Sequence, residues 1–156
     1  MNKIAFELCD YKNPEHLTAL ASLLNHYMKD PMGDCPQHDK LEQLHLIDGL
    51  ANHPTALVLF VLHNGEYAGL ATCFVNFSTF KIKPYLYIHD IIIRRKFRNQ
   101  SLGRSLMEEL ISFSREQGYC KITLEVREDN TIAKALYSSL DFSECEPRML
   151  FWSKTL

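Results

Sequence analysis

Hydrophobic and polar positions in the first third of the chain change from strand-like to helical spacing. Residues 1–8 have the pattern of a short strand, and Asn13-Pro14 then marks the start of a helix. This helix should end before Asp30-Pro31, and its apolar positions are Leu17, Leu20, Leu23, Leu24 and Tyr27. A second helix is predicted over residues 39–51, with inward-facing Leu41, Leu44, Ile47 and Leu50 or Ala51.

The middle of the chain consists of apolar, β-rich runs. Residues 55–62 and 67–77 are separated by a segment that contains Asn64-Gly65, and Asn-Gly between such runs predicts a hairpin of antiparallel strands. Residues 85–93 form another run, which ends in three consecutive isoleucines. A continuous aliphatic end is typical of a central strand buried on both faces.

The clearest amphipathic helix begins at Gly103, after the basic loop of residues 94–99, and Gly118 is a suitable stop for it. Its apolar positions are Leu106, Met107, Leu110 and Ile111. Residues 120–126 form the next strand. Strand, loop, helix and strand together predict a βαβ crossover between parallel strands.

The last third of the chain predicts one more helix and the end of the sheet. Asp129-Asn130-Thr131 has capping chemistry, and apolar residues then repeat every four positions from Ile132 to Leu140. Residues 143–146 and 149–154 would form two short strands, broken at Pro147. These elements predict an α/β (α+β) fold, in a single domain over residues 1–156. Its sheet would be mixed, mostly antiparallel and six to seven strands wide, with about four flanking helices.

Composition supports a globular domain, since hydrophobic residues are 46% and charged residues 23% of the 156. A net charge of −2 provides no basic field for nucleic acid or anionic lipid. No apolar run approaches the ~20 residues of a membrane span, and no signal-peptide pattern is present, so we expect a cytoplasmic protein. The five cysteines, without a CxxC pair, indicate buried thiols in a reducing compartment, and we expect no metal.

The segment between the buried strand and the amphipathic helix, residues 98–103, is a candidate anion site. The first turn of a helix exposes unpaired N–H groups at the positive end of its dipole, and Gly103 permits close approach of the backbone. The side chains that add positive charge for a diphosphate or a 3′-phosphate are Arg94, Arg95, Lys96, Arg98 and Arg104. No P-loop or dinucleotide fingerprint is present, and the alternative interpretation is a solvated basic turn.

Two motifs of this chain resemble those of the GNAT superfamily of N-acetyltransferases. Arg98-x-x-Ser101-x-Gly103 is similar to its Q/R-x-x-G-x-G/A acyl-CoA loop. The second motif, similar to the family's N-x-x-A-x-x-L-Y-x-x-x-G-F signature, is Asn130-x-x-Ala133-x-x-Leu136-Tyr137-x-x-x-Asp141-Phe142. Ser101 and Asp141 stand where the family has glycine. Serine keeps the N–H but its Cβ restricts φ, whereas aspartate tolerates left-handed geometry better than most residues.

The resemblance implies a fold whose central parallel strands splay into a V that admits acetyl-CoA as co-substrate. The main chain that would pair with the pantetheine amides is that of Ile91, Ile92 and Ile93. The N–H groups that would bind the diphosphate, next to Arg98, are those of Asn99, Gln100, Ser101, Leu102, Gly103 and Arg104. Asn130, with Ala133 in the same motif, would hold the pantetheine arm or its neighbouring loop.

Acetyl transfer to a primary amine requires one base and one acid. An amine of pKa near ~10.4 must lose its proton before attack, and the departing thiolate, whose thiol has a pKa near ~8.5, benefits from an acid. Tyr137 is the predicted acid, because helical spacing places it on one stripe with Asn130 and Ala133. The apolar stripe that begins at Ile132 should enter the core. The alternative for Tyr137 is an aromatic residue packed at the edge of the core.

The base is predicted within residues 87–91, a segment similar to the strand of spermidine/spermine-type acetyltransferases in which two adjacent acids stand. His89, with an ordinary pKa near ~6.5, can accept a proton at neutral pH directly or through water, although a structural histidine is the alternative. Strand alternation sends His89 and Asp90 to opposite faces unless a bulge intervenes. Glu125 is the reserve candidate, with half of an ion pair as its alternative role.

We therefore expect an N-acetyltransferase that moves an acetyl group from acetyl-CoA to a primary amine, of a small molecule, by direct transfer in a ternary complex. The alternatives are acetylation of a protein lysine or N-terminus, and a noncatalytic acyl-CoA-binding regulatory module. Recognition of the amine would fall to the first two helices, residues 77–83 and the loop of residues 30–39. The acids there that could attract a cationic amine are Asp30, Asp34, Asp39 and Glu42.

A homodimer is a further expectation. The strands predicted from Ser143 onward would leave an unprotected edge of the sheet. Phe151 and Trp152 would be exposed there, and an exposed apolar patch is typical of a contact surface.

Overall fold

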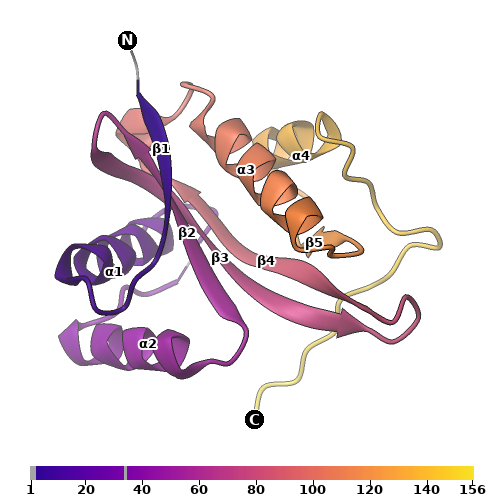
Figure 1. Ribbon diagram of the computed structural model, residues 1–156, viewed down its shortest axis with the longest axis horizontal. Coiled ribbons are helices and arrows are strands. Elements are labelled where there is room, and N and C mark those ends of the chain that lie inside the picture. The colour runs from indigo at the N-terminus through magenta and orange to yellow at the C-terminus, as the bar shows by residue number, and fades with distance from the viewer. Residues whose placement is uncertain (1–2, 34) are drawn as a thin grey trace. The chain divides into compact units, whose positions relative to one another are not determined.

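The computed structural model describes residues 3–33 and 35–156 (Figure 1). Its elements in chain order are β1 (Ile4–Leu8), α1 (Pro14–Met28), α2 (Lys40–Asn52), β2 (Ala56–His63), β3 (Glu66–Ser78), β4 (Lys83–Ile93), a 3₁₀ turn (Arg95–Phe97), α3 (Leu102–Glu116), β5 (Ile122–Leu124) and α4 (Thr131–Ser138). The chain divides into two compact units. The first, residues 1–125, contains the whole sheet, and the second, residues 126–156, contains α4.

The first unit is built on one five-stranded sheet in the order β1-β2-β3-β4-β5. Neighbouring strands are antiparallel except β4 and β5, which are parallel and joined through α3, as the crossover pattern predicted. The β2–β3 turn is formed by Asn64 and Gly65, with φ of 52° and 82°, which confirms the predicted hairpin. Helices α1 and α2 cover one face of the sheet and α3 covers the other (Figure 1).

The helices of the first unit begin and end where capping residues place them. The Asn13 side chain accepts from the N–H of Glu15 at the start of α1. Asp39 and Glu42 form a capping box at the start of α2. Leu106, Met107 and Leu110 of α3 are fully buried, as its amphipathic pattern predicted. Local signals therefore predicted these helices to within a residue or two.

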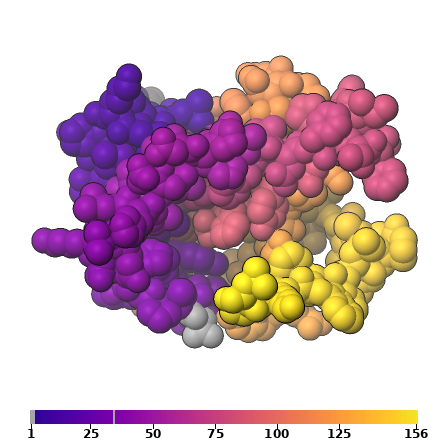
Figure 2. Space-filling view, turned by 90° about the horizontal axis from the view of Figure 1, so that it is seen from below, coloured from indigo at the N-terminus to yellow at the C-terminus, as the bar shows by residue number. Residues whose placement is uncertain are grey.

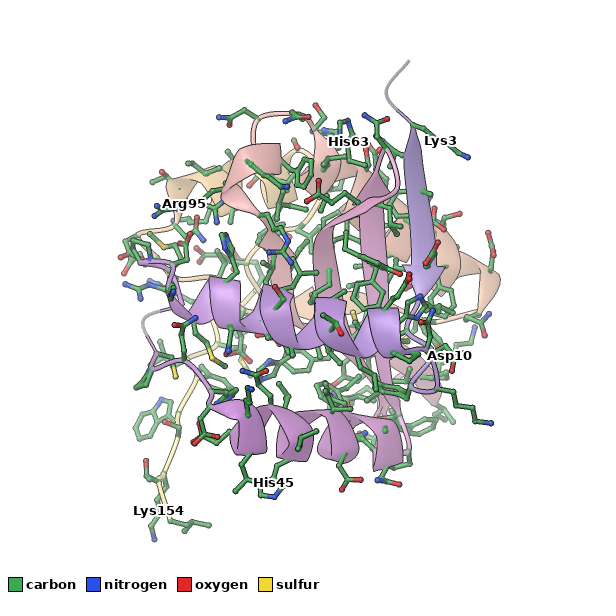
Figure 3. All side chains as sticks on the ribbon, turned by 90° about the vertical axis from the view of Figure 1, so that its left-hand side faces the viewer. Lys3, Asp10, His45, His63, Arg95 and Lys154 are labelled. Carbon is green, nitrogen blue, oxygen red and sulfur yellow. The ribbon has the colours of Figure 1, made fainter. Side chains whose placement is uncertain are left out.

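The inward face predicted for α2 is wrong for its first half. Leu41 and Leu44 are 61% and 63% exposed, whereas Leu50 is buried in the core that α1, β2 and β3 form. Helix α2 therefore contacts the core through its C-terminal half, and its outer side chains, such as the labelled His45, point away from α1 (Figure 3). In the space-filling view, the purple region that contains α2 lies at the surface (Figure 2).

The prediction of six to seven strands is also wrong, because the sheet has five. Residues 143–146 and 149–154 form no strand, and β5 covers only Ile122–Leu124 instead of residues 120–126. An apolar run becomes a strand only where a neighbouring strand supplies hydrogen-bond partners, and the three-residue edge strand β5 supplies few. Phe151 and Trp152 are exposed, as expected.

Three further findings concern the described residues. No helix among them is long and apolar enough to cross a membrane. No group of three or more His, Cys, Asp or Glu side chains among them is arranged to hold a metal ion. All five cysteines are free, but the expectation of buried thiols is wrong for Cys35 and Cys145, which are exposed, whereas Cys73 is buried.

Candidate active site

A β-bulge in β4 brings His89 and Asp90 together. Thr72 of β3 pairs with Asp90 and Cys73 pairs with Ile88, so His89 is an extra residue without a partner in this ladder. The bulge breaks the strict alternation that would have sent the two side chains to opposite faces. The Nδ1 atom of His89 lies 3.1 Å from Oδ2 of Asp90. The two side chains are therefore in hydrogen-bond contact.

The His89 ring lies between two aromatic side chains. Its centroid is 5.9 Å from that of Tyr87 and 6.0 Å from that of Phe74, both in edge-on arrangements. The hydrogen bond to Asp90 raises the pKa of His89 above its ordinary value, more strongly than burial lowers it. With Nδ1 held by Asp90, Nε2 is the nitrogen left for another partner.

Glu125, the reserve candidate for the base, is bonded to a residue that sequence reasoning had not singled out. The hydroxyl of Tyr87 donates to Oε1 of Glu125 at 3.0 Å and joins β4 to the residue after β5. Burial and this hydrogen bond raise the pKa of Tyr87 to about 12, so the tyrosine stays protonated and remains a donor. Tyr87 lies two positions before His89, and strand alternation was the signal that could have identified it.

The main chain of β4 continues beyond the end of its parallel neighbour. Strand β5 pairs only with residues 86–88, so none of its residues pairs with the last five residues of β4. The N–H of Arg94 donates to the carbonyl oxygen of Ala68 in β3. Because the peptide groups of successive residues in a strand point to opposite sides, those of Ile91 and Ile93 point away from β3. On the side of β4 that faces β5, the peptide groups of Ile91 and Ile93 therefore have no partner in β5.

The loop between β4 and α3 presents main-chain N–H groups. Asn99 and Ser101 both have a φ of 61°, and Ser101 is the N-cap residue of α3. The Ser101 side chain makes no capping hydrogen bond, so it does not cover the N–H groups of the first turn. Leu102, Gly103 and Arg104 form that turn, and its dipole favours an anion.

The basic side chains of this loop hold the loop to the rest of the first unit. Arg98 donates to the carbonyl oxygen of Ile93 at 3.0 Å and to Asp30 at 2.7 Å. Arg94 also donates to Ser22 and to the carbonyl oxygen of Tyr67, and Lys96 contacts Glu66. Arg104 contacts Glu108 of its own helix. The main chain of Arg95, labelled in Figure 3, donates to His26 of α1 at 3.3 Å. Arg94, Lys96 and Arg98 therefore help to hold the loop in position.

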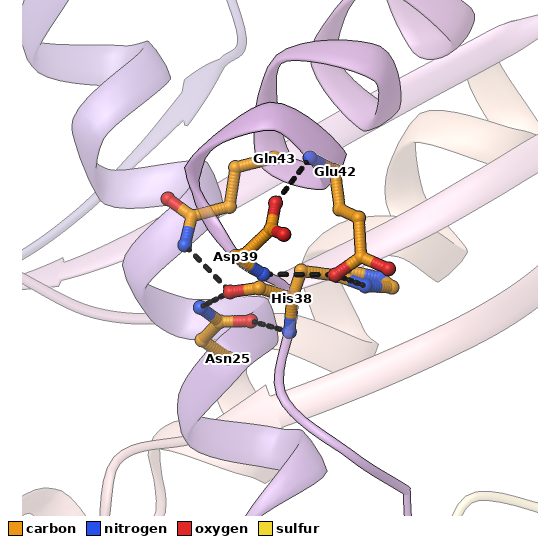
Figure 4. Close-up of polar contacts among 5 residues, drawn as sticks. All are labelled: Asn25, His38, Asp39, Glu42 and Gln43. Atoms are coloured by element: carbon orange, nitrogen blue, oxygen red, sulfur yellow. Dashed lines mark hydrogen bonds and ion pairs between the residues drawn. The ribbon is translucent and has the colours of Figure 1, made fainter.

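Acids on the α1–α2 side are bonded within the protein. Asp39 and Glu42 form the α2 cap, and Asn25 of α1 accepts from the N–H of His38 and donates to its carbonyl oxygen (Figure 4). Asp30 is buried against Arg98. Burial acts to raise the pKa of Asp30, but the hydrogen bonds from Arg98 and Met32 outweigh it and lower the pKa.

Of the four acids predicted to attract an amine, three therefore have structural partners. The fourth, Asp34, lies outside the described residues.

The second unit carries the remaining predicted residues. Asn130 is the N-cap of α4, and its side chain accepts from the N–H of Ala133 at 3.2 Å. Tyr137 is mostly buried, with its ring 6.0 Å from that of Phe142, and Asp141 has the left-handed φ of 64° that the family's glycine implies. The roles of Asn130 and Tyr137 toward a ligand stay predictions.

The apolar stripe predicted for the last helix is wrong at its first member. Ile132 is 85% exposed because it lies in the first turn of α4, next to the cap. Leu136 and Leu140 are partly buried.

Comparisons with known proteins agree on one family. The model of the Acetyltransferase (GNAT) family matches residues 19–142. The chain is 32% identical to a thialysine N-ε-acetyltransferase of Caenorhabditis elegans, over 49% of this chain and 48% of that protein. It is 37% identical to the ribosomal protein bS18-alanine N-acetyltransferase of Escherichia coli K12, over 44% and 46%. The chain thus matches about half the length of these curated relatives.

Solved structures share the fold over nearly the whole chain. The crystal structure of a probable acetyltransferase has a TM-score of 0.82 at 19% identity, over 99% of this chain and 98% of that one. An aminoglycoside N-acetyltransferase solved with CoA has a TM-score of 0.76 at 16% identity, over 100% and 97%. Because the family model matches most of the chain and the motifs stand at its expected loop and helix, the chain belongs to the GNAT family of acetyltransferases.

Proposed function

We propose that the protein is an N-acetyltransferase that transfers an acetyl group directly from acetyl-CoA to a primary amine. One observation carries the proposal: the first turn of α3 is left uncovered by its N-cap side chain, next to β4 main chain that β5 leaves unpaired. This arrangement provides N–H donors for a diphosphate and peptide groups for an amide-containing arm. The CoA-bound aminoglycoside acetyltransferase that shares this fold supports the choice of cofactor.

The proposed cofactor contacts use main chain. The N–H groups of residues 99–104 bind the diphosphate, and the peptide groups of Ile91 and Ile93 pair with the pantetheine amides. Ile92 lies between these two residues, and its side chain is buried in the core. Asn130 orders the loop at the start of α4 through its cap.

The proposed chemistry uses His89 as the base. Nε2 of His89 removes a proton from the substrate ammonium, directly or through water, and Asp90 stabilises the resulting imidazolium. The amine nitrogen then bonds to the thioester carbonyl carbon, the C–S bond breaks, and Tyr137 gives its proton to the departing thiolate. The bonded nitrogen loses its second proton, which restores the Tyr137 hydroxyl, and the first proton leaves His89 for solvent. Asp90 and Glu125 are the alternative bases, and both have other hydrogen-bond partners.

The proposed acceptor is a small cationic amine. The names of the thialysine and aminoglycoside enzymes identify small amines as acceptors of those proteins. In this chain the carboxylate of Asp90 contacts His89, and the charge of Glu125 also acts on it. The bS18-alanine enzyme favours a second candidate, the N-terminus of a protein. A free-thiol release assay with acetyl-CoA should therefore compare polyamines, lysine analogues and aminoglycosides with peptides that begin with alanine.

Three outcomes of this assay are distinguishable. Turnover with a small amine supports the proposal, and turnover with peptides alone supports the second candidate. Stabilisation by acetyl-CoA without turnover on any acceptor, unchanged by Tyr137→Phe, would instead indicate a noncatalytic acyl-CoA-binding module.

A further inference from the structure

The loop before α3 contains two residues in a conformation that side chains disfavour. At a φ of 61°, Asn99 and Ser101 lie in the left-handed region, where a Cβ atom crowds the carbonyl oxygen. Asparagine is several-fold enriched there, but serine is not. Ser101 also stands where the GNAT acyl-CoA motif has glycine. The shape of this loop therefore needs support from outside the loop.

Arg98 supplies a rigid connection at the start of the strained segment. Its Nε donates to the carbonyl oxygen of Ile93, and its Nη2 donates to Oδ2 of Asp30. Because the guanidinium is planar, these two hydrogen bonds fix the position of Arg98 between the end of β4 and the segment after α1.

Asp30 is itself held in place. Its side chain is 8% exposed, and its Oδ1 accepts from the N–H of Met32 at 3.1 Å. Its own N–H donates to the carbonyl of Tyr27 at 2.9 Å, at the end of α1. A buried carboxylate is stable only when paired and hydrogen-bonded, so Asp30 and Arg98 depend on each other.

We propose that Asp30 is a positioning residue that compensates for serine at position 101. Through Arg98 it holds the loop in the left-handed shape that glycine adopts without strain. The N–H groups at the start of α3 keep their common direction only in this shape, so tight CoA binding requires the Asp30–Arg98 pair. The inference rests on the proposed function, and it couples the segment after α1 to the cofactor loop.

Calorimetric titration of the full chain with CoA tests the proposal. Asp30→Asn keeps the size of the side chain and an acceptor for Met32 but removes the charge, and it should raise the Kd for CoA about tenfold. Adding Ser101→Gly should return the Kd to within about twofold of the wild-type value, because glycine adopts this φ freely.

The matched control is Glu108→Gln. It removes a carboxylate from the exposed Arg104–Glu108 pair of the same helix, and it should leave the Kd unchanged. Equal CoA affinity of Asp30→Asn and the wild type would overturn the proposal. A loss of affinity that Ser101→Gly does not reverse would also overturn it, since an ordinary structural defect would not be rescued by a change in φ preference.

Amide hydrogen exchange separates this proposal from the proposed function. If the wild type binds no CoA, the proposed function fails. Exchange at residues 99–104 still tests whether the Asp30–Arg98 pair holds the loop in its shape. These amides should exchange about tenfold faster in Asp30→Asn and recover with Ser101→Gly, while those of α1 stay unchanged. Unchanged exchange at residues 99–104 would overturn the inference.

Discussion

The hydrogen bond between His89 and Asp90 predicts a specific pH dependence. It raises the pKa of His89 above the ordinary 6.5, and His89 can accept a proton only when neutral. Activity should therefore fall as the pH decreases through this raised pKa. In Asp90→Asn the charge is lost, so the acidic limb of kcat/KM should move to lower pH. Measurement of kcat/KM against pH checks the shift.

Two further variants complete this test. Glu125→Gln removes a more distant carboxylate, already bonded to Tyr87, and should move the limb less. His89→Gln should remove the limb and most of the activity. An acidic limb at the same pH in Asp90→Asn and the wild type would contradict the assignment of His89 as the base.

Tyr137 allows a test of the acid with little structural change. Tyr137→Phe removes only the hydroxyl and keeps the ring that lies beside Phe142. The variant should lose about 10²-fold in kcat, the usual contribution of a general acid, with a similar KM for acetyl-CoA. Steady-state kinetics measures the loss, and thermal unfolding shows whether the variant folds normally. An unchanged kcat would exclude the hydroxyl as the proton donor.

At the level of elements, α2 and α3 should respond very differently to the same substitution. Leu110 of α3 is 0% exposed, and Leu110→Ala should reduce the free energy of unfolding by about 2–5 kcal/mol. Leu44 of α2 is 63% exposed, and Leu44→Ala should change it by less than about 0.5 kcal/mol. Urea unfolding of both variants gives the comparison. A cost above about 2 kcal/mol for Leu44→Ala would show that the outer face of α2 is covered in solution.

The helices could be predicted from sequence because their signals are local. Asn13 and Asp39 cap helices whose first turns follow them directly, and Asn64-Gly65 determines its own turn. The bulge at His89 is not local, since it depends on which β3 residues pair with Ile88 and Asp90. The strands predicted for residues 143–146 and 149–154 were wrong for the same reason, because a strand forms only where another strand pairs with it.

The candidate site could be predicted only in part. The motif around Ser101 identified the loop, and the order of strand and helix placed it at a helix start. The bond between Asp30 and Arg98 joins residues 68 positions apart, and that between Tyr87 and Glu125 spans 38. Charge alone suggested solvent or phosphate as the partner of Arg98, and no pattern in a single sequence identifies so distant a carboxylate.

For the whole molecule, a single cooperative unfolding transition is expected. The second unit is smaller than the ~40 residues below which domains rarely fold alone, so the single domain predicted from sequence should unfold as one. Acetyl-CoA at 100 times its Kd should add about 2.7 kcal/mol to the free energy of unfolding. Calorimetric scans with and without the ligand measure both quantities. Two separate transitions, only one of which shifts, would contradict this expectation.

The end of β4 that pairs with β3 but not with β5 has a consequence for which substitutions the proposed cofactor contact tolerates. A peptide group is the same in every residue except proline, so a ligand that bonds to it imposes no demand on the side chain. Under the proposed pairing with pantetheine, a change among apolar residues at positions 91 and 93 should keep the contact, whereas proline, which lacks the N–H, should break it. Hydrogen bonds from a ligand to the main chain can therefore be kept while side chains are substituted. Two solved structures with 19% and 16% identity share the fold, with TM-scores of 0.82 and 0.76.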